Sequence, residues 1–126
     1  FGAEEMMRLP GADGRLLHAA ITINGAMVML VDQDRDYAML GPRALKGSPV
    51  MLHLMVADAD AAMKRAADAG ATITMPAADM FWGDRYGMVE DPFGHRWSIA
   101  SQQRAMTLQE IRAAAATATP MAAKES

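Results

Sequence analysis

The sequence has no cysteine, no surplus of basic residues and no long apolar run. Without cysteine there is no disulfide framework, no thiolate nucleophile and no cysteine-based zinc site. The 12 Lys and Arg residues are scattered and outnumbered by 15 Asp and Glu residues, whereas a nucleic-acid-binding protein gathers basic residues to contact phosphates. No apolar run approaches the ~20 residues of a membrane-spanning helix, and no signal peptide is recognisable. These absences predict a cytoplasmic protein that binds neither nucleic acid nor membrane.

The composition indicates one globular domain. A chain of 126 residues, 52% hydrophobic and 21% charged, is long enough to form one core. The 13 methionines are unusually many. Methionine either fills gaps in a small core or lines an adaptable binding surface, and its placement on the strands decides between these alternatives.

The clearest local signal is a β-hairpin within Phe81–Ser101. Its turn is Asp91-Pro92-Phe93-Gly94, because Asp bonds the backbone two residues on, Pro presets φ, and Gly accepts a positive φ. The flanking segments Tyr86–Glu90 and His95–Ala100 are short enough to be antiparallel partners. A second tight turn is predicted at Asn24-Gly25.

Apolar patterns predict the remaining strands. Two of them are almost wholly apolar, which predicts burial on both faces: Ala26–Asp32 and Pro49–Val56. The others are expected at Met6–Leu9, Arg15–Ile23 and Ala71–Met75, with connecting loops at Gln33–Ser48 and Pro76–Asp79.

Two helices carry recognisable ends. Asp58 is the expected N-cap of a helix to about Ala69, ended by Gly70, in which Asp60 is placed to pair with Lys64. A capping box formed by Thr107 and Glu110 opens a second helix to about Ala116, followed by a frayed tail to Ser126.

The two halves of the chain repeat one pattern. Gly2-Ala3 and Gly70-Ala71 are 68 residues apart, and Gly25 and Gly94 are 69 apart. Two βαβββ modules of an α+β fold explain this, with module one at 1–32, a loop at 33–48 and module two at 49–101 in a single domain, 1–101, followed by the helix and flexible tail, 102–126. Module one lacks its opening strand and most of its helix. We therefore expect the parent protein to begin before Phe1, by roughly the length of Pro49–Gly70.

Several quoted segments resemble the vicinal oxygen chelate superfamily, the glyoxalase, bleomycin-resistance and dioxygenase group, and within it the PhnB-like branch. They are G-A-T-I from Gly70, D-A-D-A-A-M-K-R-A from Asp58, F-W-G-D-R-Y-G-M-V-E-D-P-F-G-H-R-W-S from Phe81, and F-G-A-E-E and G-R-L-L-H-A-A-I-T-I-N-G in the first half. The resemblance extends from Phe1 to about Arg112. It implies paired βαβββ modules whose curved mixed sheets enclose a cleft.

The resemblance also implies a divalent metal ion, held by His or Glu on the first and last strand of each module. The sequence departs from that pattern, because the three positions that can be compared are Met29, Met51 and Ser98. Met and neutral Ser are poor ligands for such ions. We therefore expect no metal and no other cofactor.

Strand alternation extends the predicted cleft lining from those three positions. His53 and His18 are placed on the same side, with core roles as the alternative, and Trp82, Arg85 and Arg96 are placed at the rim, where Arg85 has a structural ion pair as its alternative. The candidate ligand-binding residues are Met29, Met51, His53, Met55, Trp82, Arg85, Arg96, Ser98 and His18. The methionines are expected either to line an open cleft or to fill it. Weak catalytic candidates are His53 and Glu90.

These features predict a small-molecule-binding protein of the bleomycin-resistance type without the family metal site. One alternative is an enzyme, a relative of the lyases, isomerases or dioxygenases, that uses altered metal ligands or acid-base catalysis by His53 and Glu90. Another is a scaffold that mainly dimerises. We expect a homodimer in either case, since members of the family often pair modules across subunits and the truncated first module exposes a sheet edge.

Overall fold

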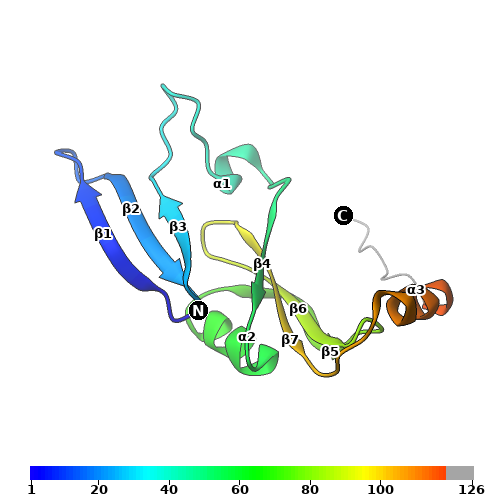
Figure 1. Ribbon diagram of the computed structural model, residues 1–126. Coiled ribbons are helices and arrows are strands. Elements are labelled where there is room, and N and C mark those ends of the chain that lie inside the picture. Colours follow the sequence, from blue (N-terminus) through cyan, green and yellow to red (C-terminus); the bar gives the residue numbers. More distant parts are fainter. Residues whose placement is uncertain (119–126) are drawn as a thin grey trace.

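The computed structural model describes residues 1–118, which form two β-sheets and three helices (Figure 1). The first sheet is antiparallel, in the order β1-β2-β3: β1 (Glu4–Pro10), β2 (Leu16–Ile23) and β3 (Ala26–Leu30). The second has the order β4-β7-β6-β5: β4 (Met51–Met55), β5 (Thr72–Asp79), β6 (Asp84–Glu90) and β7 (Arg96–Gln102). The helices are α1 (Pro42–Leu45), α2 (Ala59–Asp68) and α3 (Leu108–Thr117).

The predicted repeat is confirmed at the level of topology. Strands β1, β2 and β3 follow one another as an antiparallel meander, and so do β5, β6 and β7. The parallel strand β4 and helix α2 complete the second βαβββ module. Within residues 1–118 the first sheet has no equivalent of either. The α+β class is therefore confirmed, although only the second sheet is mixed.

Both predicted tight turns form. Asn24 and Gly25 have φ of 49° and 79°, the two positive angles of a type I′ turn. In the other turn Gly94 has φ of 90°, and the Asp91 carboxylate accepts hydrogen bonds from the backbone N–H of Phe93 and of His95. Its second oxygen accepts the Trp97 indole N–H at 3.1 Å, so one carboxylate organises the whole turn.

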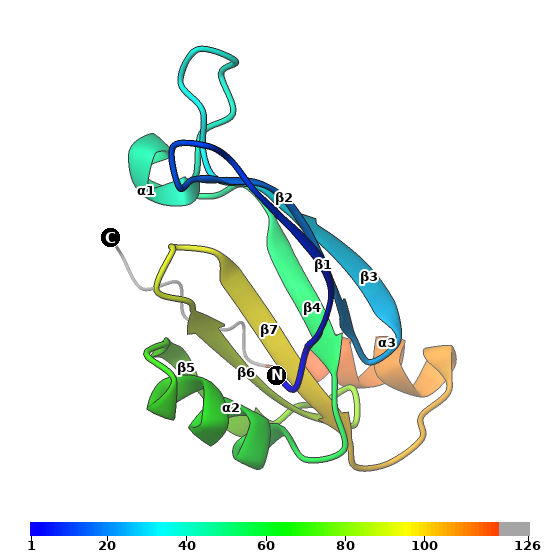
Figure 2. The same cartoon turned by 90° about the vertical axis from the view of Figure 1, so that its left-hand side faces the viewer.

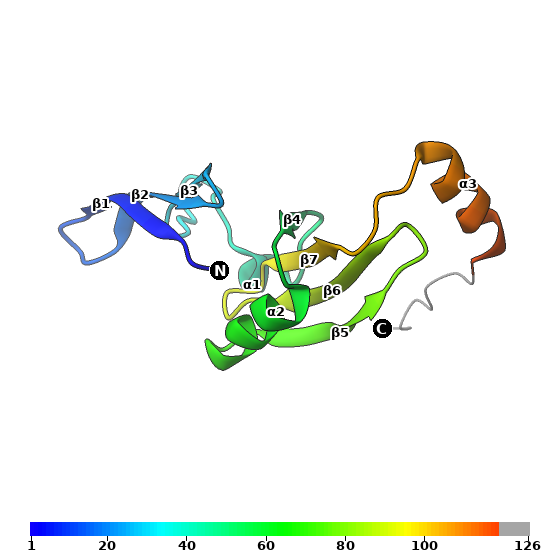
Figure 3. The ribbon, with the colours of Figure 1, turned by 60° about the horizontal axis from the view of Figure 1, so that its bottom comes forward.

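Helix α2 covers one face of the second sheet (Figure 3). Asp58 caps it by accepting the N–H of Ala61, as predicted. A side chain at Gly87 of β6 would collide with the Met63 thioether, so the glycine lets the helix lie close to the strand. The core buried between helix and sheet consists of Ala59, Met63, Ala66, Val89 and Ile99.

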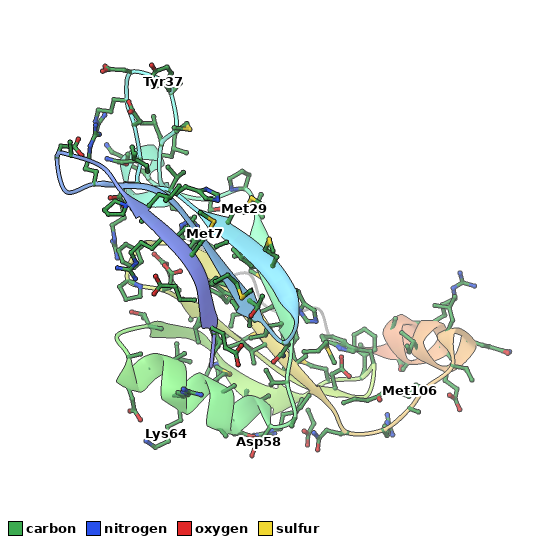
Figure 4. The ribbon with its side chains drawn as sticks, turned by 60° about the vertical axis from the view of Figure 1, so that its left-hand side comes forward. Met7, Met29, Tyr37, Asp58, Lys64 and Met106 are labelled. Atoms are coloured by element: carbon green, nitrogen blue, oxygen red, sulfur yellow. The ribbon has the colours of Figure 1, made fainter. Side chains whose placement is uncertain are left out.

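The predicted burial of the apolar strands on both faces is wrong. Met27 and Met29 of β3 are 59% and 66% exposed, and Met51 and Met55 of β4 are 42% and 47% exposed. Strand β4 is an edge strand, and β3 has no partner on its outer side within residues 1–118. Figure 4 shows Met7 and Met29 on the first sheet, away from α2, where Lys64 is labelled. An apolar run therefore predicts a strand, but it does not show whether another sheet or helix covers that strand.

Three local predictions are also wrong. The segment Pro76–Asp79, predicted to be a loop, is the second half of β5. Proline is tolerated there because β5 is an edge strand with a register shift between Met75 and Ala78. Lys64 pairs with Asp68 at 2.7 Å, one turn further along α2, and not with Asp60. The segment 33–48, predicted to be only a loop, also contains α1.

Helix α3 begins with the predicted capping box. Thr107 Oγ1 accepts the N–H of Glu110 at 3.2 Å, and the Glu110 carboxylate accepts the N–H of Thr107 at 2.6 Å. None of its residues is buried, and it stands away from both sheets in Figures 1 and 3. The predicted tail lies largely outside the described residues. Among the helices of residues 1–118, none is long and apolar enough to cross a membrane.

The first part of the chain lies beside the second sheet (Figure 2), and side-chain contacts join the two. The Phe1 ring lies 4.8 Å from that of Trp97, centroid to centroid. The Asn24 side chain donates to the Met55 carbonyl at 2.7 Å. Arg43 Nε donates to the Pro92 carbonyl at 2.8 Å and so attaches α1 to the β6–β7 turn.

Candidate ligand-binding face

The second sheet has α2 on one face and an open face on the other. Cross-strand register decides which side chains share the open face, because neighbours opposite one another point to the same side. His53 lies opposite Ser98, and Ser98 lies opposite Met88. Trp97 and Ile99 point to the opposite side from Ser98 and pack under α2. We call the open face the site face; it carries Met51, His53, Met55, Tyr86, Met88, Glu90, Arg96, Ser98 and Ala100.

A hydrogen bond joins the centre of the site face. His53 Nδ1 lies 2.7 Å from Ser98 Oγ, and His53 Nε2 lies 3.3 Å from Met55 Sδ. A thioether is only an acceptor, so we assign Nε2–H as the donor to the sulfur and Nδ1 as the acceptor of a hydrogen bond from the Ser98 hydroxyl. Ser98 is 3% exposed, whereas His53 is exposed. Three predicted site residues from two strands are thus in direct contact.

A row of aromatic rings continues from His53 across the sheet. The Tyr86 ring lies 6.3 Å from the imidazole at an interplanar angle of 22°. Trp82 meets Tyr86 edge-on at 5.4 Å, and Phe81 meets Trp82 edge-on at 5.0 Å. The Trp82 indole N–H donates to Asp84. We call His53, Tyr86, Trp82 and Phe81 the aromatic row; such a surface suits a flat, largely apolar molecule.

Tyr86 is a site-face residue outside the predicted ligand-binding set. The hairpin pattern in the sequence could have identified Tyr86. Counting back from the turn places Tyr86 opposite Ala100, two residues along β7 from Ser98 and therefore on the same face.

Arg85 does not join the site face. Its guanidinium binds both oxygens of Asp60 on α2, at 2.5 and 3.1 Å, and Asp79 at 3.2 Å. These hydrogen bonds raise the pKa of Arg85, and the Arg85 guanidinium in turn lowers the pKa of Asp60. The structural ion pair, which was the alternative role for Arg85, is what the structure contains.

Met29 and His18 lie on the other sheet. They share one face of it. Met29 is opposite Ala20, and Ala20 is two residues from His18 on β2 and points to the same side. Met29 is 66% exposed and His18 is half-buried. No hydrogen bond connects either side chain to the site face within residues 1–118, so the structure does not bring them into contact with His53.

Arg96 and Glu90 lie further along the site face, toward the β6–β7 turn. They are opposite one another, and Met51 is opposite Arg96 on its other side. Glu90 is two strands and one side-chain step from His53, about 12 Å between α-carbons at ordinary strand spacing. No hydrogen bond joins these two weak catalytic candidates within residues 1–118.

The donor set does not fit the metal ion that the resemblance implies. Ser98 shares its hydroxyl with His53, Met51 offers only a thioether, and Met29 is on the first sheet. Residues 1–118 contain no group of three or more His, Cys, Asp or Glu side chains arranged to hold a metal. Hard and borderline divalent ions prefer carboxylate and imidazole ligands, which are missing from these positions.

Comparison with known proteins agrees with the fold. The sequence profile of the Glyoxalase/Bleomycin resistance protein/Dioxygenase superfamily matches residues 1–99. The uncharacterized protein Mb0911c of Mycobacterium bovis is 48% identical over 117 residues, covering 90% of this chain and 77% of that protein. The crystal structure of TioX from Micromonospora sp. ML1 is 32% identical, with a TM-score of 0.60 over 85% of this chain and 82% of that one. TnmS3, an antibiotic binding protein from Streptomyces sp. CB03234, is 24% identical, with a TM-score of 0.56 over 80% and 76% of the two chains.

Proposed function

The chain belongs to the Glyoxalase/Bleomycin resistance protein/Dioxygenase superfamily, and from that premise we propose that it binds a small, flat, largely apolar molecule on the site face without a metal ion. The observation that carries the proposal is the His53–Ser98 hydrogen bond beside Tyr86. Ser98 is the position at which a metal-dependent member would carry a ligand. Here it forms part of a neutral surface continuous with aromatic rings.

The methionines support binding over a filled core. Met51 and Met55 border the imidazole and are more than two-fifths exposed. Flexible, polarisable thioethers beside rigid rings form a surface that adapts to ligands of different outline. The same fold serves antibiotic binding in TnmS3, which is a precedent for the fold and names no ligand for this chain.

An enzyme remains the alternative, and the His53–Ser98 contact is the observation in its favour. A histidine at 2.7 Å from a serine hydroxyl is the arrangement of a base and a nucleophile. Ser98 is only 3% exposed, however, and His53 Nε2 faces a thioether where a triad has an orienting carboxylate. We therefore favour ligand binding over catalysis as the function.

The test is a thermal-shift screen with planar aromatic compounds. A ligand that binds only the folded protein raises the melting temperature by mass action. Tyr86→Ala and His53→Ala are expected to lose the shift. Tyr37→Ala is the matched control, because Tyr37 is an aromatic residue 78% exposed at the tip of the loop between β3 and α1 (Figure 4). An equal shift in Tyr86→Ala and Tyr37→Ala would contradict the proposal.

Turnover of a bound compound distinguishes the enzyme from a binding protein. If a hit is a substrate, its product appears with wild-type protein and disappears in Ser98→Ala while the ligand still binds. If no hit is consumed and metal addition creates no activity, binding is the function. Metal-dependent turnover by wild-type protein would instead support altered metal ligands.

We also propose that the protein belongs to the PhnB-like branch and forms a homodimer. The branch rests on W-G-D-R-Y-G followed by D-P-F-G-H-R-W, from Trp82 to Trp97. The dimer is supported by the exposed apolar residues of the first sheet and by the unpartnered edge of β3 within residues 1–118. Light scattering is expected to give twice the monomer mass, and a dilution-insensitive monomer would contradict the dimer.

A further inference from the structure

A cavity of about 340 Å³ lies where the site face meets α1 and the β6–β7 turn. Its charged lining consists of Arg43, Lys46 and Arg96 with the single acid Glu90, although the chain as a whole has a net charge of -3. We call it the basic cavity; it is completed by Pro42, Gly47 and Gly94. A second cavity, of about 380 Å³, differs in charge: Arg15 and Arg35 face Asp32, Asp34 and Asp36.

The fold holds the three basic side chains from two separate elements. Arg96 begins β7 directly after the turn, and Arg43 and Lys46 come from α1 and its end. Arg43 Nε donates to the Pro92 carbonyl at 2.8 Å, which positions the guanidinium and leaves its two terminal nitrogens for another acceptor. A β-carbon at Gly94 would lie 3.1 Å from Pro42 Cβ, so the glycine allows α1 to lie against the turn.

The basic side chains of this cavity lack carboxylate partners within residues 1–118. Four other cations of the described residues do have them: Arg8, Arg15, Lys64 and Arg85 are in ion pairs. Glu90 is opposite Arg96 in the sheet, but no ion pair joins them in this part of the chain. Three positive charges thus converge on one space with one negative charge.

We propose that the basic cavity binds an anionic group, a carboxylate or a phosphate, of the molecule whose flat part lies on the aromatic row. This inference rests on the proposed function and adds a charge to its ligand. Arg96 is two residues before Ser98 on the same face, about 7 Å along the strand, and Ser98 is opposite His53. One small molecule therefore spans the basic cavity and the His53 end of the aromatic row. The planar fork of arginine matches carboxylate and phosphate oxygens, and the Lys46 ammonium adds a point charge.

The test compares two naphthalene probes, 2-naphthoate and the neutral 2-naphthalenemethanol, by calorimetric titration at low ionic strength. The naphthoate is expected to bind more tightly, and its affinity is expected to fall with added salt. Arg96→Gln and Arg43→Gln should each weaken naphthoate binding roughly tenfold, the usual size of a lost charged hydrogen bond, and leave the neutral probe unchanged. Arg112→Gln, on the exposed helix α3, is the control that removes a charge elsewhere.

A titration with inorganic phosphate, followed by amide chemical shifts, separates the two proposals. Shifts confined to 43–47 and 94–96 are expected. If phosphate moves these amides while neither naphthalene probe binds, the basic cavity stands and the proposed function fails. If the neutral probe binds as tightly as the anion, or both Gln variants bind naphthoate like wild type, the anionic group is refuted and the aromatic site stands. If nothing perturbs the cavity, this inference fails.

Discussion

His53 Nδ1 lies 2.7 Å from the hydroxyl oxygen of Ser98, although the two residues are 45 positions apart in the chain. They are brought together because β4 and β7 are parallel neighbours with His53 directly opposite Ser98. The contact uses the hydroxyl at the position where the family pattern would place a metal ligand. The contact therefore supports the proposal that this part of the sheet binds a ligand without a metal ion.

The coupling between these two side chains is measurable by a double-mutant cycle. We expect Ser98→Ala and His53→Ala to interact by about 1 kcal/mol in the free energy of unfolding, the usual net value of a protein hydrogen bond. Urea denaturation of wild type, both single variants and the double variant measures it. Additive effects would mean that the bond contributes nothing to stability.

The Asp91 carboxylate is expected to be critical for the β6–β7 turn. Asp91→Ala removes the acceptor of two backbone N–H groups and of the Trp97 indole, so we expect a loss of about 2–4 kcal/mol in unfolding free energy. Phe93→Ser in the same turn is the control; because Phe93 is 73% exposed, it should change stability by less than about 0.5 kcal/mol. Equal losses would contradict the assigned role of Asp91.

Two turn glycines should respond differently to alanine. Both Gly25 and Gly94 have positive φ, so each alanine incurs about 1–2 kcal/mol of backbone strain. A new β-carbon at Gly25 meets nothing within 4 Å, whereas one at Gly94 presses on Pro42. We expect Gly94→Ala to destabilise more in urea and also to weaken phosphate binding in the basic cavity, while Gly25→Ala leaves that binding unchanged. Equal urea midpoints and equal phosphate affinities would contradict this packing.

The Asp60–Arg85 pair predicts an acid-side loss of stability. Arg85 lowers the pKa of Asp60 in the folded protein, so the pair stabilises the fold above the unfolded-state pKa, about 3.9. That contribution disappears as the pH falls through the lower folded-state pKa, when the carboxylate becomes protonated. Wild type should therefore exceed Asp60→Asn in urea midpoint at pH 7, and the gap should shrink toward pH 2.

The control for this titration is Glu4→Gln, which removes an exposed carboxylate from β1 without touching the Arg85 pair. Its difference from wild type should vary less with pH than that of Asp60→Asn. A gap for Asp60→Asn that stays constant from pH 7 to pH 2 would show that the ion pair adds no pH-dependent stability.

Elements read from short-range signals were predictable. The Asn24-Gly25 turn, the Asp58 cap and the Thr107–Glu110 capping box each involve atoms a few residues apart, and each forms as expected. The repeat was also visible in the sequence, because glycines at matching offsets indicate two modules of similar spacing. These features determine the α+β class and the order of strands and helix along the second half of the chain.

Burial and side-chain partners were not predictable to the same degree. Met27 and Met51 belong to apolar strands, yet both are exposed, because their faces have no covering layer in the described chain. Arg85 was a rim candidate until α2 brought Asp60 to it. A strand pattern says which residues alternate, but it does not say what lies above each face.

The turns, the caps and the repeated module follow from the sequence alone, and so does the identity of Met29, Met51 and Ser98, the positions at which the family resemblance implies metal ligands. The contact between His53 and Ser98, the place of Tyr86 in the aromatic row and the approach of the basic side chains of α1 to Arg96 exist only in the folded chain. The difference lies in how far apart along the chain the interacting groups are. Turns and caps are closed by neighbouring backbone groups, whereas a binding face is assembled from strands and helices whose separation depends on how the whole chain packs.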